Sequence, residues 1–188
     1  NLCFTNGKRK YEYPYLIASR NEGSRERGSF TTADWVYLIM PDRFANGNPD
    51  NDSTSDTSEK AQRSVPWRRH GGDLQGMMEH LDYIADLGAT AIWSTPLLLD
   101  NEDGTSYHGY SCSDYYLIDP RFGTNEMFKE YVDECHKRNL KVIMDIVPNH
   151  SSTTHWWYDD QPFKDWTHQW DKYTQSNWTF STNMDFNA

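Results

Sequence analysis

Three short apolar runs, separated by two helical patterns, constrain the fold of this chain more than any other feature. The runs are "DWVYLIM" at 34–40, "TAIWSTPLL" at 90–98 and "LKVIMDIV" at 140–147. Each is a short run of mostly apolar residues, which is typical of a strand buried on both faces of a parallel sheet. The order strand, helix, strand, helix, strand predicts parallel βαβ units. An open doubly wound sheet and a closed (β/α)8 barrel both fit this order.

Helix boundaries can be read from the residues that begin and end each pattern. The first pattern is predicted as one helix that stops at Gly88, and the second begins after Thr124, a good N-cap, and ends at Asn139. A strand-like segment at 8–20 and a polar link at 21–29 precede the first apolar run. The apolar stripes of the two helices are Leu74, Met77, Met78, Leu81, Ile84 and Ala85, and Met127, Phe128, Tyr131, Val132 and Cys135.

Composition excludes several functions. The net charge of −10 argues against nucleic acid as a partner, because such binding needs basic patches. No apolar run is long enough to span a bilayer. The three cysteines match no metal-binding spacing and identify no compartment. The aromatic content of 15% indicates a folded chain, and most of these rings are expected in the core.

Polar groups crowd the end of the third apolar run, where "DIVPNH" spans 145–150. In both candidate folds, functional groups collect at the carboxyl ends of the strands. Asp145 is costly to bury unless it is paired, and it could equally cap a turn. The neutral imidazole of His150 can donate and accept hydrogen bonds, which suits a sugar hydroxyl.

The loop "NGNPDND" suggests a calcium site. Its residues Asn46, Asn48, Asn51 and Asp52 offer four side-chain oxygens within seven positions, and Ca²⁺ takes six to eight oxygen ligands. The alternative is an Asx-rich turn without metal. Asp42 and Arg43 are expected to form an ion pair nearby, and the acidic run 50–59 is otherwise expected to be a solvated face.

With these pieces placed, the sequence resembles the α-amylase family of glycoside hydrolases, closest to its neopullulanase and cyclomaltodextrinase branch. The similarity rests on "DIVPNH", on "YHGY" at 107–110, on "NHSSTTHWW" and on "DRFANGNPDND". The resemblance implies the α/β fold of a TIM barrel, with strands 1–3 of the (β/α)8 barrel in residues 31–150. Residues 1–30 would be the tail and linker of an N-terminal β-sandwich domain, and 151–188 the start of an irregular domain inserted after strand 3.

The resemblance also assigns roles to individual residues. It implies that Asp145 accepts hydrogen bonds from an arginine beside the nucleophile. His150 would bind sugar hydroxyls, Tyr110 would stack on the sugar ring, and His108 would lie near its hydroxymethyl group. Asn149 would brace the loop. The calcium site would be completed by Gly71 and Asp73 of the "GGD" segment, although Asp73 could instead cap its helix. His155, Trp156 and Trp157 would line the cleft or pack.

The implied activity is retaining hydrolysis of α-1,4-glucosidic bonds in maltooligosaccharides, cyclodextrins, pullulan or starch. Retaining glycosidases need two carboxyl groups, which in this family follow later strands, so we expect the 188-residue chain to be inactive alone. Alternatives are a transglycosylase or isomerase of the same fold, and a non-catalytic, calcium-stabilised carbohydrate-binding module. A homodimer of the full-length enzyme is compatible with the resemblance, as is a periplasmic, cell-surface or cytoplasmic location.

Overall fold

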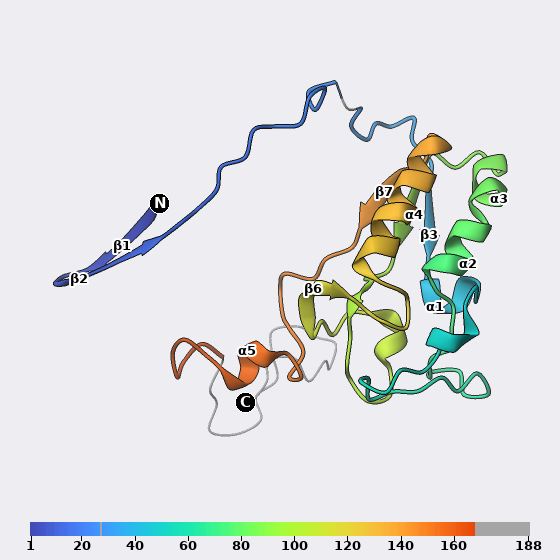
Figure 1. Cartoon of the computed structure of the whole chain (residues 1–188). Coiled ribbons are helices and arrows are strands. Elements are labelled where there is room, and N and C mark those ends of the chain that lie inside the picture. The colour runs from blue at the N-terminus through green and yellow to red at the C-terminus, as the bar shows by residue number, and fades with distance from the viewer. Residues whose placement is uncertain (27, 168–188) are drawn as a thin grey trace. The chain divides into compact units, whose positions relative to one another are not determined.

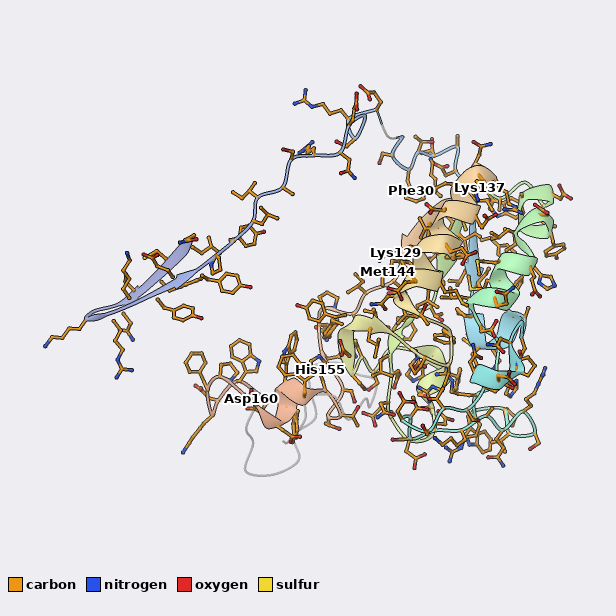
Figure 2. All side chains as sticks on the ribbon, viewed as in Figure 1. Phe30, Lys129, Lys137, Met144, His155 and Asp160 are labelled. Carbon is orange, nitrogen blue, oxygen red and sulfur yellow. The ribbon has the colours of Figure 1, made fainter. Side chains whose placement is uncertain are left out.

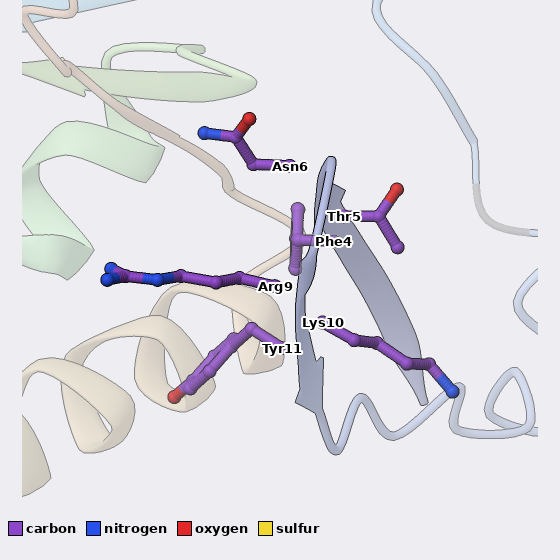
Figure 3. Close-up of a pocket in the computed structure, with 6 residues that line it drawn as sticks. All are labelled: Phe4, Thr5, Asn6, Arg9, Lys10 and Tyr11. Carbon is purple, nitrogen blue, oxygen red and sulfur yellow. The ribbon is translucent and has the colours of Figure 1, made fainter.

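The computed structural model describes residues 1–26 and 28–167, and the chain divides into two compact units, Asn1–Ala33 and Asp34–Ala188. The first unit contains strands β1 (Leu2–Asn6) and β2 (Arg9–Tyr13), which pair antiparallel. Only the second of these strands lies in the segment predicted from the sequence. A pocket on this hairpin is lined by residues 4–6 and 9–11 and contains none of the predicted site residues (Figure 3).

The second unit is built on a three-stranded parallel sheet (Figure 1). Its strands are β3 (Val36–Ile39), β4 (Ala91–Ser94) and β7 (Lys141–Met144), in the order β3-β4-β7. The register pairs Leu38 with Trp93 and Trp93 with Ile143. All three strands fall inside the three apolar runs, so the predicted βαβαβ order is confirmed.

The two faces of this sheet differ in burial. Ile39 and Ile92 point to the face that joins the core, where both are at most 2% exposed. On the opposite face, Leu38 is 59% exposed and Trp93 is 39% exposed. The prediction of strands buried on both faces is therefore wrong for Leu38 and Trp93, although Ala91 on the same face as Trp93 is completely buried.

The first predicted helix is two short helices, α2 (Leu74–Glu79) and α3 (Leu81–Asp86), so the prediction of one helix is wrong. The break lies at His80, where φ is −114°. Its imidazole Nδ1 lies 2.8 Å from the carbonyl oxygen of Gly76, while its backbone N–H bonds to Met77 instead. The side chain thus takes the carbonyl that the helix would have used. Gly88 follows α3 with φ of +89°, as the predicted stop requires.

The second predicted helix is confirmed as α4 (Asn125–Lys137). Thr124 Oγ1 accepts a hydrogen bond from the N–H of Met127 at 3.1 Å, so Thr124 is the N-cap. Tyr131 and Cys135 of the predicted stripe are completely buried. Asn139 follows the helix in the left-handed conformation, with φ of +57°. Helix α4 packs against α2 and β7.

The segments predicted as loops contain further short elements. Strands β5 (Leu98–Leu99) and β6 (Asp114–Ile118) form an antiparallel ribbon that the sequence analysis missed, and a 3-10 turn η2 (Ser106–His108) lies between them. The first loop holds helix α1 (Pro41–Phe44) and turn η1 (Pro49–Asn51). Helix α5 (Trp156–Asp159) begins after His155, labelled in Figure 2. No described helix is long and apolar enough to cross a membrane. Residues 168–188 of the predicted inserted domain lie outside the description.

Candidate active site

Asp145 lies directly beyond the carboxyl end of β7, whose last residue, Met144, is labelled in Figure 2. Alternation along the strand directs Asp145 to the same face as Ile143 and Trp93. Its Oδ2 atom accepts a hydrogen bond from the indole Nε1 of Trp93 at 3.0 Å and from the Tyr110 hydroxyl at 3.2 Å. The structure therefore joins Asp145 to Tyr110, 35 residues earlier in the chain.

Tyr110 presents its ring at the surface while its hydroxyl is held. The residue is 39% exposed, and its hydroxyl donates to Asp145. Partial burial and the negative charge of Asp145 raise the pKa of the Tyr110 hydroxyl above its ordinary value. The hydroxyl is thus held as a donor to Asp145, while part of the side chain remains exposed at the surface.

His150 belongs to the same cluster. Its Nε2 atom lies 3.0 Å from the carbonyl oxygen of Tyr110. Because a carbonyl only accepts, Nε2 carries the proton, and Nδ1 then accepts from the amide of Asn149 at 3.3 Å. Both ring nitrogens thus have protein partners, and His150 fastens the "DIVPNH" segment to the Tyr110 loop. The hydroxyl of Tyr115 lies 2.7 Å from the carbonyl oxygen of His150 and holds the other side of that segment.

His108 lies on the same loop, with its ring centroid 5.8 Å from that of Tyr110. Its Nδ1 atom accepts a hydrogen bond from the backbone N–H of Tyr110 at 2.9 Å. Burial lowers the pKa of the His108 imidazole, although the charge of Glu59 opposes this shift. His108 is therefore neutral at pH 7, with the proton on Nε2 as a donor for a ligand hydroxyl.

The predicted metal-binding residues also come together, around the carboxylate of Asp73. This carboxylate accepts three backbone N–H bonds, from Gly47 at 3.0 Å, Asn48 at 2.9 Å and Gly76 at 2.7 Å. The last of these caps α2, as the alternative interpretation expected. Asp73 thereby fixes the predicted calcium loop to the start of α2.

The donor set of this loop fits calcium. Among the described residues, Asn46 Oδ1 and Asn51 Oδ1 are buried and accept no hydrogen bond. The Asn46 amide nitrogen donates to Asp52 Oδ1 at 2.7 Å, and burial raises the pKa of Asp52. A Cβ on Gly71 would come within 2.5 Å of the Asp52 carboxylate, so the backbone there passes close to it. Two buried amide oxygens beside a carboxylate are the kind of oxygen ligand that Ca²⁺ takes.

One of the predicted residues, Asn48, has an additional role. Asn48 Oδ1 accepts from the N–H of Asp50 at 3.1 Å and caps turn η1. No group of three or more His, Cys, Asp or Glu side chains able to hold a metal occurs in the described part of the chain. A cation in this loop would therefore be held mainly by amide and backbone oxygens, which suits Ca²⁺ better than Zn²⁺.

Other expectations around the site have mixed outcomes. The Asp42–Arg43 ion pair is confirmed, and the Arg43 guanidinium also lies 4.1 Å from the Tyr107 ring centroid. The acidic run is not solvated throughout, because Glu59 at its end is only 1% exposed. His155 is buried against the rings of Tyr115 and Trp157, so its role is packing. Trp156 and Trp157 are exposed.

Sequence reasoning missed two residues at the site. Trp93 holds Asp145, and the period-two alternation of the adjacent strands is the signal that could have placed them on one face. Asp100 is completely buried, and its carboxylate accepts from the N–H groups of Glu102 at 3.2 Å and Ser111 at 3.1 Å. It ties together both ends of the loop that carries His108. Burial raises the pKa of Asp100 to about 7.

A parallel β/α sheet that carries polar and aromatic groups beyond the carboxyl ends of its strands has the arrangement of the barrel enzymes. Comparison with known proteins specifies the class. Residues 38–185 match the family described as "Alpha amylase, catalytic domain". The chain belongs to the α-amylase family, and the prediction of strands 1–3 of a (β/α)8 barrel is confirmed.

Relatives within the family come from the branch that the sequence resembles. The chain is 40% identical to a cyclomaltodextrinase from Geobacillus thermopakistaniensis over 141 residues, 72% of this chain and 22% of the relative. It is 39% identical to neopullulanase 2 from Thermoactinomyces vulgaris over 172 residues, 83% of this chain and 27% of the relative. A crystal structure of an Anoxybacillus α-amylase is similar with a TM-score of 0.65 and 44% identity, covering 77% of this chain and 30% of that one. The chain spans less than a third of the length of these relatives.

Proposed function

We propose that this chain forms part of the active site of a retaining α-glucan hydrolase that cleaves α-1,4-glucosidic bonds. The observation that carries the proposal is the convergence of Asp145, Tyr110 and His150 through direct hydrogen bonds. A carboxylate, an exposed aromatic ring and an imidazole with a free N–H are the groups that bind and orient a hydroxyl-rich ring. Substrates of this class are maltooligosaccharides, cyclodextrins, pullulan and starch.

In this proposal each residue has a separate role. The Tyr110 ring stacks on the apolar face of the sugar, and the Nε2–H of His108 donates to a hydroxyl near it. Asp145, oriented by Trp93, supplies the negative charge that pairs with a cationic partner of the nucleophile. Both carboxyl groups that retaining hydrolysis requires are expected outside residues 1–188, so these residues position the substrate for them.

We further propose that the loop of residues 46–52 binds Ca²⁺, together with Gly71 and Asp73. Two buried amide oxygens without donors, Asn46 Oδ1 and Asn51 Oδ1, support this proposal. The cation would be structural: it would neutralise Asp52 and Asp73, whose charges repel each other. The charge of the bound ion would stabilise the loop, and no catalytic step would pass through it.

The experiment that tests the activity uses the complete gene product with maltoheptaose, β-cyclodextrin and pullulan. We expect release of reducing sugar. Tyr110→Ala should lower kcat/KM by about tenfold or more, since it removes both the stacking ring and a bond to Asp145. Tyr110→Phe keeps the ring and should lose less. Tyr116→Ala is the matched control, because Tyr116 is 77% exposed on β6. Failure of the parent protein to cleave all three substrates would reject the proposed function.

Transfer instead of hydrolysis is the second candidate. The observation in its favour is a similar solved structure whose title names a cyclomaltodextrin glucanotransferase, 35% identical with a TM-score of 0.58. Product analysis separates the two reactions. Glucose and maltose accumulating from maltoheptaose indicate hydrolysis, whereas products longer than the substrate indicate transfer.

A further inference from the structure

The acidic run 50–59 ends in a buried carboxylate that contacts the sugar-binding loop. Glu59 is 1% exposed. Its Oε2 atom accepts two hydrogen bonds from Ser106, one from the backbone N–H and one from the hydroxyl, each at 2.7 Å. Both donors of Ser106 therefore bind the same carboxylate oxygen of Glu59, which lies 47 positions earlier in the chain. Such charge-assisted bonds are shorter and stronger than neutral ones.

The position of Ser106 fixes where His108 and Tyr110 lie. Ser106 begins the turn η2, which places His108 two residues later. The turn ends at Gly109, where φ is +76° and an added Cβ would come within 2.2 Å of the Pro96 carbonyl oxygen. The chain is thus pressed against the end of the sheet at Gly109 and held at Ser106. Little freedom remains for the residues between and beside these points.

Other charged groups surround the contact between Glu59 and Ser106. Arg69, itself 1% exposed, donates to the carbonyl oxygen of Ser106 at 3.2 Å. Arg121 donates to the backbone carbonyl oxygens of Glu59 and Asp100, and is held by Asp119 through a bond of 2.7 Å. The base of the loop at Asp100 is therefore joined to Ser106 through Arg121 and Glu59.

We propose that Glu59 is a positioning residue for the loop that presents His108 and Tyr110 to the sugar. The inference rests on the proposed function for its catalytic consequence, but the restraint on the loop is a separate, measurable property. Glu59 acts through Ser106 and touches no substrate. Its second oxygen, Oε1, accepts no hydrogen bond within the described residues and lies 3.6 Å from Arg68. A glutamine at this position keeps one acceptor for Ser106, whereas an alanine keeps none.

Hydrogen exchange of the complete gene product, followed by mass spectrometry, tests the restraint. Glu59→Ala should speed the exchange of amides in 103–110 by about tenfold or more, given the usual strength of bonds to a charged group. Exchange in α4 (125–137) should stay unchanged. Glu59→Gln should recover part of the protection. Asp56→Ala is the matched control, because Asp56 is an exposed acid of the same run.

Steady-state kinetics with maltoheptaose on the same variants then tests the consequence. We expect Glu59→Ala to lower kcat/KM about tenfold and Asp56→Ala to leave it unchanged. If Glu59→Ala does not fold, Ser106→Ala removes one of the two bonds and should give a smaller change in the same peptides. Exchange that is unaltered in 103–110, or raised equally in α4, overturns the proposal. An inactive parent protein would reject the proposed function alone, because the exchange result still decides the restraint.

Discussion

Replacing Asp73 by alanine should destabilise the protein more than any exposed substitution, and its effect can be worked from three contacts. The completely buried carboxylate accepts the N–H groups of Gly47, Asn48 and Gly76. A hydrogen bond to a charged group contributes about 1.5 kcal/mol or more. Three of them give about 4 to 5 kcal/mol, and water entering the space left by the side chain reduces this to about 3 to 4 kcal/mol.

The assay is thermal denaturation with and without calcium. For a unit of this size, about 1 kcal/mol corresponds to about 2–4 °C in Tm, so Asp73→Ala should lower Tm by about 6–16 °C. Chelation with EGTA should lower the Tm of the parent protein, and Ca²⁺ should restore it. In Asp73→Ala the response to Ca²⁺ should be lost.

A matched control isolates the cause. Asp86 is an exposed acid at the end of α3, and Asp86→Ala should change stability by no more than about 0.5 kcal/mol. The reasoning is refuted if Asp73→Ala melts within 2 °C of the parent. A calcium response that persists unchanged in Asp73→Ala removes this residue from the metal site and leaves it as a helix cap.

Three further predictions follow from single features of the structure. Thr124→Ala should cost about 1 kcal/mol in urea denaturation, and Thr124→Ser should restore most of it, because only the hydroxyl caps α4; equal losses would contradict this. Asp100 has a folded-state pKa of about 7 against an ordinary 3.8, so its contribution to stability is complete below about pH 4 and is lost as pH rises through 7. That loss is about 4 kcal/mol. Asp100→Asn should reduce the difference between the urea midpoints measured at pH 5 and at pH 8. A difference as large as that of the parent protein would contradict this prediction. The purified 188-residue polypeptide should release no reducing sugar from maltoheptaose, because retaining hydrolysis needs a pair of carboxyl groups; any release above a heat-treated sample would overturn this.

Much of the fold could be predicted because it depends on local patterns. Three apolar runs located β3, β4 and β7, and Thr124 and Asn139 marked both ends of α4. The prediction failed at His80, where a side chain competes for a backbone carbonyl. It failed also at the ribbon of β5 and β6, because β5 has only two residues and therefore shows no period in the sequence.

The order of the elements, the helix caps and the chemical types available at the strand ends follow from local patterns in the sequence. Which of those groups meet depends on how the chain folds. Folding buried Glu59, which the composition of its segment marked as solvated, and it brought Asp145 to Trp93 and Tyr110. Periodicity in the sequence depends on the conformation of the local backbone. The burial and charge of a carboxylate depend instead on donors that lie tens of residues away, and these come near only when the sheet forms.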